Sequence, residues 1–279
     1  MKTFKNLILI TICVFSITVQ AHEKAFEVEV KGQGEAVLLF PGFTCTGDVW
    51  NDVVEELSKT NECHIFTFAG FGNVPAIDTP WLSKVKEGID QYISKNKLQK
   101  ATIIGHSLGG TLGLWIATDE DAMFNKIIVI DALPSTGALI IPNFNSETIV
   151  YDNSFNQRLL DMDVTSFEAM ATQMASNMSL NKEKHDLIKE WILKTDRKTY
   201  VYGYTDLLKL DLRESIAKIT IPVTILAATE PYGEDVVKKT YEEQYKYLED
   251  YSIKFAKASA HFIMFDQPKW LLSIIKAEL

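Results

Sequence analysis

Short apolar runs alternate with helical stretches along most of the chain. Continuous apolar runs of about four to eight residues are typical of strands that are buried on both faces of a parallel sheet. The runs that predict strands are residues 25–30, 36–40, 64–68, 101–105, 126–130, 222–228 and 251–256. The helical stretches among them are 50–57, 81–94, 108–117 and 269–277. This alternation predicts an α/β protein, with a mostly parallel sheet that carries helices on both faces.

The alternation stops between Asp131 and Pro222, where no run predicts a strand. This region instead contains four stretches of helical character, at 146–162, 166–179, 181–194 and 197–209. The second stretch begins with the spacing of a capping box over Thr165–Glu168. An apolar stripe then follows one helical face, made by Phe167, Met170, Ala171, Met174 and Met178. Such a stripe either packs against a neighbouring helix or forms an apolar wall that faces a ligand, and one stripe can do both.

The first 21 residues have the pattern of a secretory signal peptide. Lys2 and Lys5 precede an apolar run over residues 7–19, and Val19-Gln20-Ala21 is a plausible cleavage site. The run is short for a membrane span, so an uncleaved anchor is the less favoured interpretation. We therefore expect export to the periplasm or the medium, with no membrane span after cleavage.

The charge of the chain excludes one class of partner. The formal net charge is −9 and the isoelectric point is near 5.1. Cleavage after Ala21 would remove two lysines and no acidic residue, which takes the net charge to −11. Nucleic-acid binders carry clustered Lys and Arg, and the sequence has no such cluster. No metal-ligand cluster or phosphate loop is present either, so we expect no nucleic-acid partner and no metal or organic cofactor.

The predicted mature chain contains two cysteines, Cys45 and Cys63. Cys45 follows the strand at 36–40, whereas Cys63 precedes the strand at 64–68. In neighbouring parallel strands these positions lie at opposite edges of the sheet. A five-residue strand is roughly 15 Å long, which is too far for a disulfide bond. We therefore predict that the two thiols stay free.

The motif Gly105-His106-Ser107-Leu108-Gly109 lies between a predicted strand and a predicted helix. In that context a serine between two glycines indicates a nucleophile elbow, a tight turn that exposes the serine hydroxyl. The helix that follows directs its first N–H groups toward the serine, where they can stabilise an oxyanion.

A serine nucleophile needs a base. The predicted mature chain has five histidines, at 22, 64, 106, 185 and 261. His261 follows the last predicted strand, and so its loop lies at the same sheet edge as Ser107. The other four lie at the chain start, on the far strand, inside the elbow and in a polar helix of the strand-free region. We therefore assign the base to His261.

Five segments together resemble the α/β-hydrolase family: LLFPGF (38–43), AGFG (69–72), GHSLGG (105–110), DLRESIAKITIPV (211–223) and SAHFIMFDQP (259–268). The resemblance implies a hydrolase core over 22–133 and 218–279, and a helical cap over 134–217 that follows the sixth strand. It also implies Ser107 as the nucleophile, His261 as the base, and the N–H groups of Phe43 and Leu108 as the oxyanion hole. Pro41 replaces the usual histidine, which leaves the backbone donor of Phe43 intact.

The acid of the triad departs from the family pattern. With Ala228 at the usual glycine, the usual aspartate position is Pro231, which has no carboxylate. Some members carry the acid after the sixth strand, and that position here is Asp131. Asp131 lies at a strand end. It also follows Ser107 and precedes His261 along the chain, which is the order of nucleophile, acid and base that this fold needs. We prefer Asp131 for the acid, with Glu230 and Asp235 as alternatives.

The sequence thus predicts an exported serine hydrolase that cleaves a carboxylic ester, or a related acyl bond, of a small molecule through a covalent acyl-enzyme. Phe167, Met170 and Met174 are candidate substrate-lining residues of the cap. Lactonase, thioesterase and aminopeptidase activities use the same triad and stay open. A binding or sensing module with little turnover is the alternative outside enzymes.

Overall fold

The computed structural model describes residues 24–119 and 124–279, so the predicted signal peptide lies outside the described residues. The chain forms a seven-stranded sheet in the order β1-β3-β2-β4-β5-β6-β7. The strands are β1 (Phe26–Lys31), β2 (Glu35–Phe40), β3 (Asn61–Phe68), β4 (Thr102–His106), β5 (Lys126–Ile130), β6 (Val223–Ala228) and β7 (Tyr251–Ala256). Only β1 runs antiparallel to its neighbour in this sheet. The expected fold class is therefore confirmed.

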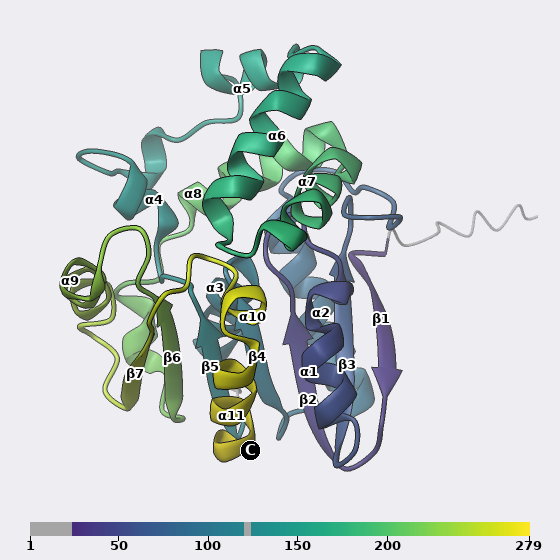
Figure 1. Cartoon of the computed structure of the whole chain (residues 1–279), viewed down its shortest axis with the longest axis vertical. Helices are drawn as coiled ribbons and strands as arrows, with labels where there is room; N and C mark the ends of the chain where they lie inside the picture. The colour runs from purple at the N-terminus through teal and green to yellow at the C-terminus, as the bar shows by residue number, and fades with distance from the viewer. Residues whose placement is uncertain (1–23, 120–123) are drawn as a thin grey trace, which may run out of the picture.

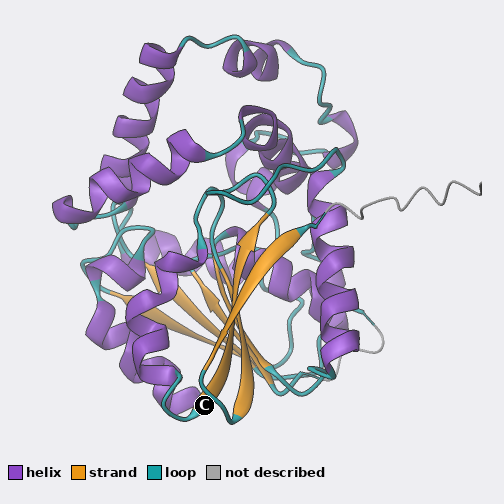
Figure 2. Ribbon diagram, turned by 90° about the vertical axis from the view of Figure 1, so that its right-hand side faces the viewer, coloured by secondary structure: helices purple, strands orange, loops and turns teal. Residues whose placement is uncertain are grey.

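Helices cover both faces of the sheet. The helices that pack on it are α1 (Asn51–Leu57), α2 (Trp81–Asn96), α3 (Leu108–Ala117), α9 (Glu234–Gln244), α10 (Ile263–Asp266) and α11 (Pro268–Glu278). Buried residues of α2, α3 and α9 form one apolar cluster with the sheet, and those of α1 and α11 form a second cluster on the other face. In Figure 1, α1 and α11 lie in front of the sheet. Figure 2, turned by 90°, shows the sheet between its helical layers.

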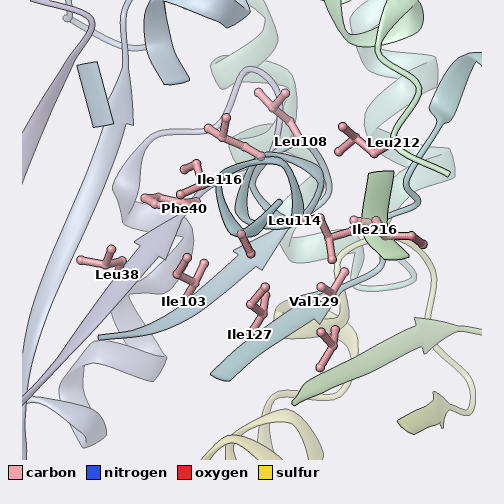
Figure 3. Packing of buried hydrophobic residues seen from close by; sticks show 14 of the residues in the cluster. Leu38, Phe40, Ile103, Leu108, Leu114, Ile116, Ile127, Val129, Leu212 and Ile216 are labelled. Atoms are coloured by element: carbon pink, nitrogen blue, oxygen red, sulfur yellow. The ribbon is translucent and has the colours of Figure 1, made fainter. Parts of the chain in front are cut away.

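The apolar strands explain this layering, because successive side chains of a strand point to opposite faces. In β2, Leu38 and Phe40 join the cluster with α3, whereas Val37 and Leu39 join the cluster with α1. Figure 3 shows the first of these clusters, in which Leu38, Phe40 and residues of β4 and β5 pack against α3. A strand buried in this way needs apolar residues at every position, and this produces the continuous runs in the sequence.

A helical insertion lies between β5 and β6, and we call residues 131–222 the insertion. It contains α4 (Thr136–Ile140), α5 (Ser154–Leu160), α6 (Val164–Met178), α7 (His185–Lys194), a π-helical turn over Thr199–Gly203, and α8 (Tyr204–Lys209). It lies over the carboxyl ends of the parallel strands (Figure 1). The insertion directly follows β5, the strand before Asp131, which is the strand that the family numbering of the sequence analysis counts as the sixth.

Two details of the insertion differ from the sequence prediction. The helix expected over 146–162 is a 3-10 turn at Ser146–Thr148 followed by α5. The predicted capping box at Thr165 is wrong, because α6 begins earlier and Asp163 caps it: Ser166 N–H donates to Asp163 Oδ1 at 2.9 Å. The aspartate lies two residues before the predicted cap and satisfies a free N–H group in the first turn of the helix as it actually begins.

In the part of the chain that the structure describes, we find no helix with the length and apolar character that a membrane span requires.

Cys45 and Cys63 are both buried and form no disulfide, which confirms the prediction from the sequence. Cys63 pairs with Val37 near the start of β2, whereas Cys45 lies beyond its end. Burial raises the pKa of the Cys63 thiol to about 11 and raises the pKa of Cys45 as well. Both groups are therefore protonated and shielded in the folded protein.

We predict that the two thiols react only when the protein unfolds. Protein expressed without residues 1–21 should release almost no thionitrobenzoate from Ellman's reagent in buffer, because thiolate is the reactive form. The same protein in denaturant without reductant should react with a stoichiometry of two. A stoichiometry of zero in denaturant would contradict the free thiols.

Candidate active site

Ser107 occupies the tight turn that joins β4 to α3. Its backbone has φ 51° and ψ −121°, a conformation that costs energy for any residue with a side chain. Its N–H donates to the carbonyl of Ile130 at 2.9 Å, which fixes the turn against the end of β5. The side chain is half-buried and lines a cavity, so the hydroxyl is accessible from that side.

The flanking glycines let α3 approach the sheet. A Cβ atom on Gly105 would lie 2.3 Å from the carbonyl oxygen of Gly109, and one on Gly109 would lie 2.2 Å from that of Phe40. Both are backbone atoms that cannot move aside. The turn at Ser107 therefore requires glycine at both positions, as the motif indicates.

His261 lies on the loop between β7 and α10, at the same edge of the sheet as Ser107. Its Nδ1 atom lies 2.6 Å from Oδ2 of Asp131, and its ring lines the same cavity as Ser107. No hydrogen bond joins the Ser107 and His261 side chains among the described residues. Because Nδ1 is engaged with a carboxylate, Nε2 is the ring nitrogen that can exchange a proton with a hydroxyl group in the cavity.

The loop of His261 is held from two directions. His106 Nε2 and the carbonyl oxygen of His261 are 3.0 Å apart, so this nitrogen carries the proton and donates. Burial lowers the pKa of His106 well below its usual value, so this imidazole stays neutral. On the other side, Asp266 accepts a hydrogen bond from the N–H of Ala260 in the histidine loop at 2.8 Å. The same carboxylate accepts three hydrogen bonds from the α6–α7 turn: from Ser179 Oγ at 2.6 Å and from the N–H groups of Leu180 and Asn181 at 3.0 and 3.1 Å. One carboxylate thus links the histidine loop to the insertion.

Asp131 follows β5 directly and has a positive φ of 45°. Its N–H donates to the carbonyl of Leu226 at 2.7 Å. Its Oδ1 atom accepts hydrogen bonds from the N–H of Ala228 and the hydroxyl of Tyr241, each at 2.9 Å. The carboxylate therefore has three donors, counting the imidazole of His261 on Oδ2.

The two alternative acids lie elsewhere. Glu230 is exposed and lines the cavity, and its N–H donates to the carbonyl of Ser259 at 2.9 Å. Asp235 is exposed in the first turn of α9 and is absent from the cavity lining. Neither carboxylate hydrogen-bonds to His261 among the described residues, so the structure brings only Asp131 of the three candidates to the histidine.

The two expected oxyanion donors are the backbone N–H groups of residues next to the Ser107 turn: Leu108 directly follows Ser107, and Phe43 follows Gly42, where a Cβ atom would lie 3.3 Å from that of Ser107. Phe43 follows the end of β2 and lines the cavity, and Leu108 is the first residue of α3. Neither N–H donates a hydrogen bond to another residue in the described part of the chain. Free N–H groups at a helix start, beside a serine, are suited to hold a developing negative charge.

The cavity has a volume of about 650 Å³ and lies between the sheet edge and the insertion. Most of its lining is apolar and comes from α4, α5, α6, α8 and α9. Met170, Met174 and Met178 of α6 all face it. Apart from the histidines, its charged lining residues are Asp131 and Glu230. No lysine or arginine belongs to the described lining of the cavity.

Phe167 does not belong to this lining, which corrects its assignment as a substrate-lining residue. Its ring packs edge-on against Tyr200, and the guanidinium of Arg197 lies 3.6 Å from the ring centroid. The apolar stripe of α6 thus divides between two roles, because Phe167 packs inside the insertion whereas the methionines face the cavity.

Two residues that contact this site could not be recognised in the sequence: His106, which supports the histidine loop, and Tyr241, which donates to Asp131. Both act through contacts between segments far apart in the chain.

No group of three or more His, Cys, Asp or Glu side chains suited to hold a metal is found within residues 24–119 and 124–279.

Comparisons with known proteins agree with this architecture. The pimeloyl-acyl-carrier-protein methyl ester esterase of Vibrio campbellii is 26% identical over 200 residues, which cover 69% of this chain and 74% of that protein. The enzyme of the same name from Vibrio cholerae is 23% identical over 260 residues, which cover 90% of this chain and 92% of that protein. The crystal structure of an enol-lactonase from Burkholderia xenovorans superposes with a TM-score of 0.76 at 13% identity, over 90% of this chain and 95% of that one.

The family model described as "Alpha/beta hydrolase family" matches residues 37–274, most of the chain. It spans the Ser107 turn, the insertion and the histidine loop. The resemblance recognised in the sequence is therefore confirmed, and the chain belongs to the alpha/beta hydrolase family.

Proposed function

We propose that this protein is a serine esterase that hydrolyses carboxylic esters of small molecules through a covalent acyl-enzyme. The observation that carries the proposal is the 2.6 Å contact between Asp131 and His261 at the cavity that Ser107 also lines. A serine on a strained turn, with a histidine oriented by a carboxylate, is the arrangement that acyl transfer requires. The Vibrio relatives, which are named as methyl ester esterases, support an ester as the substrate.

In the proposed reaction, Ser107 Oγ attacks the ester carbonyl while His261 Nε2 takes the hydroxyl proton. Asp131 stabilises the imidazolium that forms and holds the ring in the correct tautomer. The N–H groups of Phe43 and Leu108 stabilise the oxyanion of the tetrahedral intermediate. His261 then donates its proton to the leaving alcohol. In the second half of the reaction, His261 takes a proton from water as the water attacks the acyl-enzyme, and returns it to Ser107 Oγ when the acid is released.

The insertion supports a proposal on the substrate. We propose that residues 134–217 act as a cap whose Met170, Met174 and Met178 contact an apolar acyl or alkyl group. Methionine side chains adapt their shape and suit such a role. The absence of lysine and arginine from the described lining, together with the carboxylate of Glu230, favours uncharged groups over anionic ones.

The location of the reaction follows from the first residues of the chain. We propose that residues 1–21 act as a signal peptide and that the enzyme works in the periplasm or outside the cell. The support for this proposal is the basic start, the short apolar run and the small-residue site at Val19-Gln20-Ala21.

Ser107→Ala should abolish turnover of a chromogenic short-chain ester while the protein keeps its thermal unfolding temperature, because the change removes only the nucleophile. A fluorophosphonate probe should label the wild type and leave the variant unlabelled. Equal labelling of both proteins would reject Ser107 as the nucleophile.

Asp131→Asn should lower kcat by about 10⁴-fold, because the amide keeps the shape but favours the wrong histidine tautomer. Glu230→Gln and Asp235→Asn are matched controls, since each also exchanges one carboxylate for an amide, and each should lose about tenfold or less. Steady-state kinetics on one neutral ester measures all three. A larger loss in either control than in Asp131→Asn would assign the acid to that residue.

A negative charge on the acyl chain should weaken catalysis, because the lining offers that charge no cation. The dimethyl and monomethyl esters of one straight-chain diacid share the acyl chain, and one end carries a methyl ester in the first and a carboxylate in the second, so their rates are compared per ester group. We expect kcat/KM to fall by about tenfold or more from the dimethyl to the monomethyl ester, and Glu230→Gln to narrow the difference. An equal or higher kcat/KM for the monoanion would contradict the proposed selectivity.

A further inference from the structure

The buried face of α9 holds the segment that follows β5. Tyr241 donates to the carboxylate of Asp131, and one helical turn later Tyr245 donates to the carbonyl of Ala132 at 2.7 Å. Between them, Gln244 bonds to both the N–H and the carbonyl of Ser135, at 3.3 and 3.1 Å. Two side chains of α9 and that of Tyr245, which directly follows it, thus fix the segment that carries the proposed acid, although no catalytic side chain is assigned to α9.

Tyr241 differs from the other two because it contacts the carboxylate itself. The two oxygens of Asp131 have separate partners: Oδ2 faces His261, whereas Oδ1 accepts from Ala228 N–H and Tyr241 Oη. A single donor on Oδ1 would hold the plane of the carboxylate less tightly. A second donor on the same oxygen, from a different element of the fold, restricts rotation about the Cβ–Cγ bond further and so helps to set the direction of Oδ2 toward the imidazole.

Tyr241 is suited to act as a permanent donor. Its side chain is buried, with 6% relative exposure. Burial and the nearby negative charge of Asp131 raise the pKa of this phenol well above its usual value. The hydroxyl therefore stays protonated, and an ionised carboxylate can only accept from it.

From this geometry we propose that Tyr241 is a positioning residue of the esterase reaction, which orients Asp131 and through it His261. The inference rests on the proposed function, because it requires Asp131 to act as the triad acid. Tyr241 is not itself a catalytic residue. Its side chain lines the cavity, but its hydroxyl is bonded to the acid, so its proposed effect on the reaction passes through Asp131 and His261.

Tyr241→Phe removes the hydroxyl and keeps the ring in the core. Asp131 retains two donors in this variant, so we expect a partial loss, with kcat lower by about tenfold and KM within about twofold of the wild type. The Nδ1–H proton of His261, observed by NMR, should shift because its acceptor has lost a fixed direction. If Tyr241→Phe fails to fold, Tyr241→Met tests the same point, because it removes the same hydroxyl and fills the core with a different side chain. This variant should show the same loss of kcat.

Tyr245→Phe is the matched control. Tyr245 is also buried, directly follows the last residue of α9, and stacks on Tyr241 with ring centroids 6.0 Å apart. Its hydroxyl anchors the backbone of Ala132 and does not touch the carboxylate. We expect Tyr245→Phe to lower the unfolding temperature but to keep kcat and the Nδ1–H resonance close to those of the wild type.

A double-mutant cycle separates positioning from general stability. If the Tyr241 hydroxyl acts through Asp131, its removal should have almost no further effect on kcat in the Asp131→Asn background. The inference is overturned if Tyr241→Phe keeps the kcat of the wild type, if Tyr245→Phe loses as much, or if the loss from Tyr241→Phe is undiminished in that background. Full activity of Asp131→Asn alone would instead reject the proposed acid, so the two failures are distinguishable.

Discussion

The distance between α3 and the sheet is the constraint on which the site depends. With Gly109 against the carbonyl of Phe40, no side chain separates the helix from β2 and β4. This contact forces Ser107 into its strained turn and brings the first N–H of α3 beside the loop that follows β2. The serine and both free backbone donors thus come from one backbone-to-backbone contact. A family built on this contact can vary its acid and its insertion without disturbing the nucleophile.

The position of the acid illustrates such variation. A carboxylate after β5 reaches His261 only if the chain turns sharply at the strand end, and the positive φ of Asp131 makes that turn. The N–H of Ala228, at the end of β6, then satisfies the oxygen that faces away from the histidine. Pro231, at the position where the resemblance places the acid, has no carboxylate, and Asp131 is the one candidate acid that hydrogen-bonds to His261 among the described residues. The end of β6 thus supports the proposed acid and does not supply it.

Most of the fold could be predicted from the sequence because buried parallel strands and nucleophile elbows leave local signals. The apolar runs marked all seven strands, although β3 begins at Asn61 and not at His64. The preference for Asp131 over Glu230 and Asp235 came from the family resemblance together with a topological rule, that parallel strands end at one edge of the sheet. The same rule placed Cys45 and Cys63 at opposite edges.

Local sequence patterns could not predict the features that depend on contacts between residues far apart in the chain. The stripe on α6 could not reveal that Phe167 turns toward Arg197 whereas Met170 faces the cavity, because both lie on one helical face. The cap spacing at Thr165 was matched by chance, and only the observed path of the chain shows that Asp163 does the capping. Tyr241 lies 110 residues from Asp131, in a helix whose own pattern indicates only core packing.

Asp266 has a consequence for how a substrate could enter. Its carboxylate is shared between the α6–α7 turn and the histidine loop, and the N–H of Phe262 donates to the carbonyl of Met178 at 3.0 Å beside it. Lifting this end of the insertion would break these bonds and pull the base away from Asp131. Any opening that keeps the geometry of the site must therefore leave the α6–α7 turn in place. α4 and α5 lie above the sheet as well (Figure 1), and they line the same cavity but form no hydrogen bond to the histidine loop among the described residues. The hydrogen bonds of Asp266 thus tie one wall of the cavity, and not the whole of it, to the loop of the proposed base.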